Sequence, residues 1–202
     1  MSLIPVIRCN NWVEVKFPSQ FQPYFFFLPF NYIDLYFVPI EMKIIMEINF
    51  NIRETNNKED SIIADHFYQM WIDIGIPEDS IKSNHHHITL DFIKQARQKL
   101  FFQAFFAEVD NIIVGSASCQ LFTGLYPQIL EDKERKYGYI WGVYVESSYR
   151  QKGIGKKLTD ATVEYLKKIG CTRAILNASP AGQSVYESLG FSPSNGMQLN
   201  LI

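Results

Sequence analysis

The stretch that decides the fold is Tyr149-Arg-Gln-Lys-Gly-Ile-Gly-Lys-Lys157, in which two glycines stand among basic side chains. It lies between an apolar run at residues 139–145 and an amphipathic run at residues 158–169. The first run predicts a strand and the second predicts a helix. The first N–H groups of a helix have no intrahelical partner, and the helix dipole places partial positive charge beside them. Because glycine lets an anion approach the backbone closely, the stretch predicts a turn that holds a diphosphate.

Two familiar phosphate-binding patterns do not fit this turn. A Walker loop requires Gly-x-x-x-x-Gly-Lys-Ser/Thr, and the sequence around Gly155 does not have that spacing. A dinucleotide-binding turn requires a third glycine where this chain has Leu158. What remains is Arg-x-x-Gly-x-Gly from Arg150 to Gly155, after a strand that ends in Val-Tyr-Val. A solvated basic turn has the same composition, so the motif alone leaves both interpretations open.

The sequence that follows the turn supplies the context. Apolar residues recur at three- and four-residue steps over residues 158–169, which predicts one apolar helix face, and Gly170 then ends the helix. Residues 173–178 predict a short buried strand, and residues 181–189 predict a second helix. The end of that helix reads Val185-Tyr-Glu-Ser-Leu-Gly-Phe191.

These two motifs together resemble the GNAT superfamily of N-acetyltransferases. The Arg-x-x-Gly-x-Gly turn is similar to the family's coenzyme A pyrophosphate loop, and residues 185–191 are similar to its Leu-Tyr-Glu-x-Leu-Gly-Phe signature. The resemblance extends over residues 48–202 and implies an α+β (mixed αβ) fold with a central mixed β-sheet flanked by helices. It also implies an enzyme that moves an acetyl group from acetyl-CoA directly to an amine of a small molecule, protein or peptide. A non-catalytic acyl-CoA-binding module that regulates a partner has the same loop and stays open as the alternative.

The resemblance assigns roles to individual positions. The strand end would bind the donor through its backbone, the turn would hold the pyrophosphate, and one residue ahead of the last helix would contact the pantetheine arm. These donor-binding positions are Val143, Tyr144, Val145, Arg150, Gln151, Lys152, Gly153, Ile154, Gly155, Lys156 and Ser179. Tyr186 matches the tyrosine that serves as general acid toward the coenzyme A sulfur.

Other interpretations of the same residues remain. Many relatives have asparagine where this chain has Ser179, and a serine before Pro180 is also a natural helix cap. By pattern alone, Tyr186 also fits an amphipathic core tyrosine. No general base is identified, because Glu146 and the three histidines at residues 85–87 are expected on the surface. One of these histidines as base, or a water chain that ends at backbone carbonyls, stays open.

The overall composition limits the classes of partner that the chain is expected to bind. A net charge of −2 argues against a nucleic-acid binder, and the basic turn is a local feature. The three cysteines are scattered without metal-ligand spacing, which predicts a reducing, cytoplasmic location and no metal. None of them suggests an acyl-enzyme, so direct transfer is expected. Acetyl-CoA and an amine acceptor are the expected partners, and homodimerisation stays open.

The first 46 residues differ from the rest. They are rich in aromatic residues and proline, whereas the acetyltransferase-like pattern occupies residues 47–202. The apolar run at 24–40 is too short and too interrupted for a membrane span. An extra packed subdomain, an interfacial anchor, or translation from Met42 or Met46 would each explain the segment, and the last of these is favoured.

The remaining patterns predict a strand at residues 48–53, a helix at 62–74 capped by Ser61 and a helix at 90–99 capped by Thr89. They also predict a hairpin of residues 101–109 and 112–121 around Asp110-Asn111, and a last strand at 196–202. Residues 76–87 and 125–136 are expected to be irregular polar connections.

Overall fold

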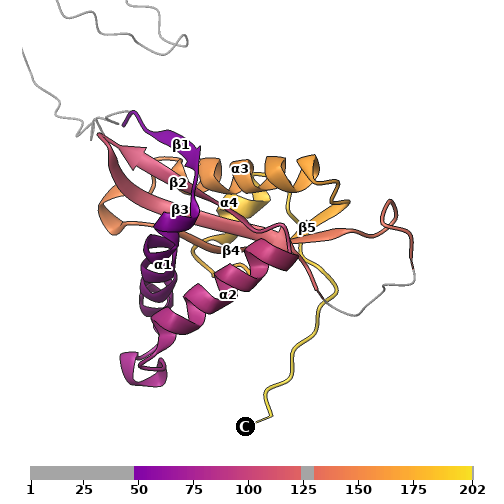
Figure 1. Cartoon of the computed structure of the whole chain (residues 1–202), viewed down its shortest axis with the longest axis horizontal. Helices are drawn as coiled ribbons and strands as arrows, with labels where there is room; N and C mark the ends of the chain where they lie inside the picture. The colour runs from indigo at the N-terminus through magenta and orange to yellow at the C-terminus, as the bar shows by residue number, and fades with distance from the viewer. Residues whose placement is uncertain (1–47, 124–129, 202) are drawn as a thin grey trace, which may run out of the picture. The chain divides into compact units, whose positions relative to one another are not determined.

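The computed structural model describes residues 48–123 and 130–201, all within the compact unit Ile45–Ile202 (Figure 1). Residues 1–47, 124–129 and 202 lie outside the described part, and with them the predictions for the N-terminal segment. The elements in chain order are β1 (Asn51–Glu54), η1 (Asn57–Glu59), α1 (Asp60–Asp73), η2 (Glu78–Ser80), α2 (His85–Lys99), β2 (Gln103–Val109), β3 (Ile112–Leu121), β4 (Tyr137–Val145), η3 (Ser147–Tyr149), α3 (Ile154–Lys168), β5 (Arg173–Ile175) and α4 (Gln183–Glu187).

The five strands form one mixed sheet in the order β1-β2-β3-β4-β5. Neighbouring strands are antiparallel except β4 and β5, which are parallel. The predicted mixed αβ fold is confirmed. The predicted hairpin is β2–β3, and its turn residues Asp110 and Asn111 have φ values of 50° and 65°. These positive angles are what a two-residue hairpin turn requires and what Asp and Asn tolerate.

The sheet buries a core on each face, because successive strand side chains point to opposite sides. In β2, Phe105 and Ala107 pack with residues of α3, whereas Ala104 and Phe106 pack with residues of α1 and α2. Figure 1 shows the same arrangement, with α1 and α2 on one side of the strands and α3 and α4 on the other. The molecule therefore presents β4 between two helical layers.

Close packing fixes α3 against β4. Leu166 of α3 fills the space beside Gly138, where an added Cβ would lie 2.4 Å from a Leu166 methyl carbon. Gly170 follows the helix with φ +81°, as its position after the last apolar residue predicted. On the other face, Arg97 of α2 makes an ion pair with Asp60 of α1 at 2.5 Å. This pair ties the two helices together.

Several predicted helix boundaries were wrong. Ser61 lies inside α1, whose N-cap is Glu59 with no side-chain cap. The capping box belongs to η1, the short turn just before α1, and is formed by Asn56 and Glu59. Residues 85–87 belong to α2 and not to an irregular connection. Thr89 lies inside this helix, where its hydroxyl donates to the carbonyl of His85, and does not cap it. The helix α3 begins at Ile154, four residues before the predicted start.

The end of the chain departs furthest from expectation. β5 and α4 are both shorter than predicted. The predicted last strand is absent from the described residues 196–201, where Met197, Leu199 and Leu201 are exposed. Their alternation is strand-like, but a strand forms only where a neighbouring edge accepts its hydrogen bonds.

Candidate donor- and acceptor-binding site

The strand β4 separates from β5 partway along its length. The parallel pairing ends at Tyr139 with Ile175, whereas β4 continues to Val145. A β-bulge lies in this second half, since Ser116 pairs with Tyr144 but Ser118 pairs with Trp141. The backbone of the second half of β4 is therefore open on the side that β5 covers in the first half.

The predicted turn lies at the end of this open strand. Gly153 is the N-cap of α3 with φ +81°, and no side chain caps the helix. The amide of Lys157 donates to the carbonyl of Gly153 at 3.1 Å, so the amides before it lie in the first, unpartnered turn. A Cβ at Gly155 would meet only a methyl of Val145, at 3.8 Å. The turn thus offers backbone N–H groups with open space beside them.

The side chains of the turn have different neighbours. Ile154 is 1% exposed and packs in the core, so only its backbone is available to a ligand. The ammonium of Lys152 donates to the carbonyl of Ser148 at 2.9 Å, and Lys156 is exposed. Gln151 has φ 61°, a left-handed conformation that directs the chain into the helix.

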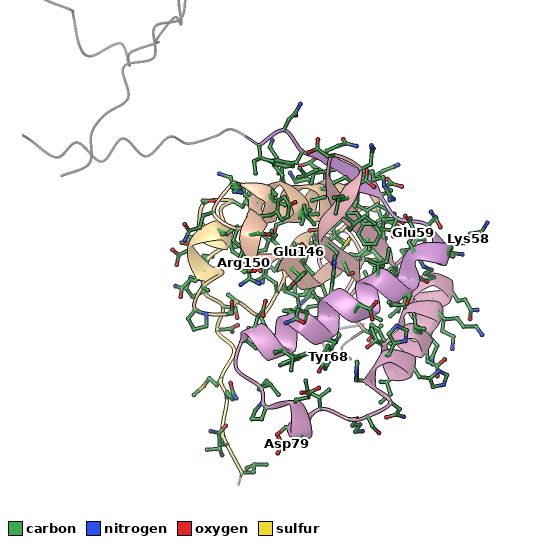
Figure 2. All side chains as sticks on the ribbon, turned by 90° about the vertical axis from the view of Figure 1, so that its left-hand side faces the viewer. Lys58, Glu59, Tyr68, Asp79, Glu146 and Arg150 are labelled. Carbon is green, nitrogen blue, oxygen red and sulfur yellow. The ribbon has the colours of Figure 1, made fainter. Side chains whose placement is uncertain are left out.

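Arg150 is held by protein groups. Its Nε donates to the carbonyl of Val145 at 2.7 Å, and one of its two terminal guanidinium nitrogens pairs with Asp73 at the end of α1. Figure 2 shows Arg150 and Glu146 at the loop after β4, close to the helix that carries Tyr68. The sequence did not indicate Asp73, because a carboxylate at a helix end is ordinarily a solvated surface group. The pair joins the turn to α1.

A cavity of about 570 Å³ lies against the open half of β4. Its lining joins residues 139–143 of β4, residues 176–179 after β5, and Tyr186 of α4. The opposite wall comes from α1 and α2 and is mainly aromatic and aliphatic: Phe67, Met70, Trp71, Ile74, Ile88, Thr89 and Phe92. The predicted residues Val143, Ser179 and Tyr186 thus share one cavity.

Tyr186 and Ser179 have distinct surroundings. The ring of Tyr186 packs edge-on against Phe191 with centroids 6.1 Å apart. Burial raises the pKa of its phenol, so the group stays protonated at neutral pH. The hydroxyl of Ser179 accepts from the amide of Gly182 at 3.3 Å in the turn before α4, but the N-cap of that helix is Gly182 and not Ser179. Asn177 lines the same cavity and donates to the hydroxyl of Tyr139 at 3.2 Å.

The candidate bases lie outside the cavity lining. His85 stacks on Tyr68 with centroids 4.3 Å apart. His86 and His87 lie near carboxylates of their own helical layer, Asp65 and Asp91. Glu146 is also absent from the cavity lining, as are all three histidines.

A further histidine, which the sequence did not single out, is buried. His66 of α1 is 9% exposed, and its Nδ1 lies 3.0 Å from the hydroxyl of Ser116. Its ring lies 4.9 Å from that of Tyr144. Burial lowers the pKa of His66 to about 4, so its imidazole is neutral at pH 7.

The described cysteines are free, and burial raises the pKa of both thiols. Cys119 is fully buried in β3, as expected of a core residue. A raised thiol pKa leaves little of the thiolate that nucleophilic catalysis needs. Within residues 48–123 and 130–201 no cluster of His, Cys, Asp or Glu has the arrangement of a metal site. Across the same residues, no helix combines the length and apolarity needed to cross a membrane.

Known structures share this fold. A crystal structure of a predicted acetyltransferase with acetyl-CoA from Clostridium acetobutylicum is 26% identical, covers 76% of this chain and 97% of its own, and has a TM-score of 0.65. A GCN5-related N-acetyltransferase from Ralstonia eutropha JMP134 is 19% identical, with coverages of 76% and 99% and the same TM-score of 0.65.

Sequence relatives point the same way. A glucosamine 6-phosphate N-acetyltransferase of Trypanosoma brucei brucei is 38% identical over 79 residues, which are 39% of this chain and 50% of the relative. One from Arabidopsis thaliana is 37% identical over 57 residues, 28% of this chain and 38% of the relative. The matches thus span half or less of these curated relatives. The model of the Acetyltransferase (GNAT) family matches residues 64–191, more than half of the chain. The chain therefore belongs to the GNAT family of acetyltransferases.

Proposed function

We propose that this protein is an acetyl-CoA-dependent N-acetyltransferase that transfers the acetyl group directly to an amine acceptor, a small molecule or a protein or peptide amine. One observation carries the proposal: Tyr186 and the open half of β4 line the same cavity, and β4 leads into an uncapped helix N-terminus. Direct transfer requires a positioned thioester and a proton donor for the leaving thiolate, and the turn would anchor the donor. We assign this activity to the domain at residues 47–202.

Donor binding would use the backbone more than side chains. The turn at residues 150–156 would hold the pyrophosphate on the amides of the first turn of α3, where the helix dipole favours an anion. Gly153 supplies the positive φ, and Gly155 keeps that surface free of a side chain. The arm of the donor would then follow Val143 to Val145 and pass Ser179.

The chemical step needs few protein groups. The neutral amine attacks the thioester carbonyl, and the backbone amides of β4 would stabilise the charge that develops on the carbonyl oxygen. When the intermediate collapses, the C–S bond breaks and the thiolate leaves. Tyr186 would protonate this thiolate, a transfer that is mildly uphill from a phenol to a thiolate and is helped when the two are already hydrogen-bonded. The nitrogen would release its proton to water as the amide forms, and solvent would return a proton to the phenolate of Tyr186.

The test measures donor binding and turnover separately. Calorimetry should show acetyl-CoA binding to the full chain, and a panel of amines should yield coenzyme A with a stoichiometric acetylated product. Binding without turnover on any amine would favour the non-catalytic acyl-CoA-binding module. Absence of binding would refute the assignment of the turn at residues 150–156.

A further inference from the structure

The wall opposite β4 has an unusual composition for a substrate cavity. Among the described residues that line the cavity, none is Asp, Glu, Lys, Arg or His. An acceptor with a phosphate, a carboxylate or several ammonium groups would therefore find no ionic partner among these groups.

Three of the seven residues in that wall are aromatic, and they pack against one another or against Trp141 of β4. Phe67 stands edge-on to both Trp71 and Trp141, with centroids 5.9 Å and 5.1 Å apart. Phe92 meets Trp141 in the same way at 5.6 Å. These contacts leave other ring faces and edges toward the cavity, where an acceptor could pack in the offset or edge-on geometry that aromatic groups prefer.

Several large apolar side chains of this wall are exposed to solvent. Trp71 is 39% exposed, Phe92 44% and Ile74 47%, and all three line the cavity. Large apolar side chains that gather around a cavity and remain accessible mark a binding surface for an apolar partner. The part of the ligand that meets this wall must therefore be apolar.

Several polar side chains of the lining already form hydrogen bonds within the protein. The hydroxyl of Thr89 donates to the carbonyl of His85 at 2.9 Å, and the indole of Trp141 donates to Gln120 at 3.3 Å. Asn177 donates to the hydroxyl of Tyr139. On the described wall from α1 and α2, Thr89 is the one polar side chain, so a sugar placed against this wall would have its hydroxyls desolvated with little compensation.

We propose that the acceptor is a hydrophobic primary amine, with its amine toward β4 and an aromatic or aliphatic body against Trp71, Ile74 and Phe92. This inference rests on the proposed acetyl transfer and names its substrate class. It differs from the phosphorylated sugar of the two sequence relatives, whose phosphate would lie in an uncharged cavity. An apolar cavity also favours the neutral form of an amine, the form that attacks, and this suits a site with no base in its described lining.

The first experiment compares acceptors that share a primary amine. Using the full chain with saturating acetyl-CoA, kcat/KM is measured for phenylethylamine, hexylamine, ethanolamine, spermidine and glucosamine 6-phosphate. The two hydrophobic amines should exceed each of the others by about 100-fold, since an apolar pocket discriminates by the burial of whole methylene and ring groups. A polar or phosphorylated acceptor that is turned over as well as phenylethylamine would overturn the inference. Acetyl-CoA binding without turnover of either hydrophobic amine would also overturn it.

The second experiment locates the acceptor. Trp71→Ala should raise KM for phenylethylamine by about tenfold, the loss expected for one well-packed aromatic contact, with acetyl-CoA affinity unchanged. The control is Ile112→Ala, because Ile112 is a 58% exposed apolar residue that does not line the cavity. It should change neither constant. Equal KM values for Trp71→Ala and the native chain would overturn the inference. Failure of the native chain to bind acetyl-CoA would instead count against the proposed function itself.

Discussion

Replacing Tyr186 by phenylalanine removes one hydroxyl from the cavity and leaves the ring in place. The ring keeps its edge-on contact with Phe191, and no described residue hydrogen-bonds the hydroxyl. The free energy of unfolding should therefore change by less than about 0.5 kcal/mol, as for substitutions that break no buried partner. Acetyl-CoA affinity should also stay within about twofold, because the proposed role of the phenol begins only when the thiolate leaves.

Turnover should respond strongly to the same change. Proton transfer from a positioned side chain contributes about 10²–10⁴-fold, so kcat should fall by at least about 100-fold, equivalent to about 2.7 kcal/mol in the barrier. Because burial raises the pKa of the Tyr186 phenol, any alkaline loss of kcat from this group should set in at a higher pH than an ordinary tyrosine would give.

The assay follows coenzyme A release with a thiol reagent, and acetyl-CoA affinity by calorimetry. Tyr165→Phe is the matched control, because burial also raises the pKa of that phenol and its hydroxyl donates to the carbonyl of Phe101 at 3.1 Å, outside the cavity lining. It should cost about 1 kcal/mol of stability and leave kcat unchanged. If Tyr186→Phe retains kcat within threefold, the general-acid role is wrong.

Three further changes test other parts of the structure. Gly155→Val should fold normally, since its Cβ meets only Val145 at 3.8 Å, but should abolish calorimetric acetyl-CoA binding; unchanged affinity would refute the loop assignment. His66 has its pKa lowered from 6.5 to about 4, so the unfolded chain binds more protons between these values and stability is lost as pH falls through them. Urea titrations should show a loss of up to about 3 kcal/mol between pH 6.5 and 4 that His66→Gln removes; an equal slope in both proteins would contradict this. Gly138→Ala should lower the free energy of unfolding by about 1–3 kcal/mol, because its Cβ would lie 2.4 Å from buried Leu166; an unchanged melting temperature would show that the helix adjusts without cost.

The sequence predicted those parts of the fold whose signals are local. The hairpin follows from Asp110-Asn111, because both residues adopt the positive φ that the turn demands. The end of α3 follows from Gly170 for the same reason. The start of α2 could not be predicted, since histidines have no strong helix signal and Thr89 looks like a cap from the sequence alone.

The site was predictable only where a motif marks it. The turn at 150–156 and Tyr186 carry recognisable patterns, and the structure places Tyr186 in the cavity that β4 lines. The acceptor wall carries none, because Phe67 and Trp71 on one helix face read as ordinary core. Only the arrangement of α1 and α2 in space shows that these residues border a cavity. The role of Asp73 as a partner of Arg150 likewise depends on a contact 77 residues apart in the chain.

The separation of β4 from β5 has a consequence for the stability of the loaded protein. Beyond Tyr139, β4 pairs with no strand of the described residues on its β5 side, and a donor arm with its own amide groups would take the place of the missing strand. Donor binding would then bridge the gap between β4 and β5, and the amides of β4 past Tyr139 should exchange with deuterium more slowly than in the protein without donor. By mass action, donor at about 100 times its Kd should add about 2.7 kcal/mol to the unfolding free energy. We therefore expect the protein without donor to be less stable and more open along β4 than the protein with donor bound.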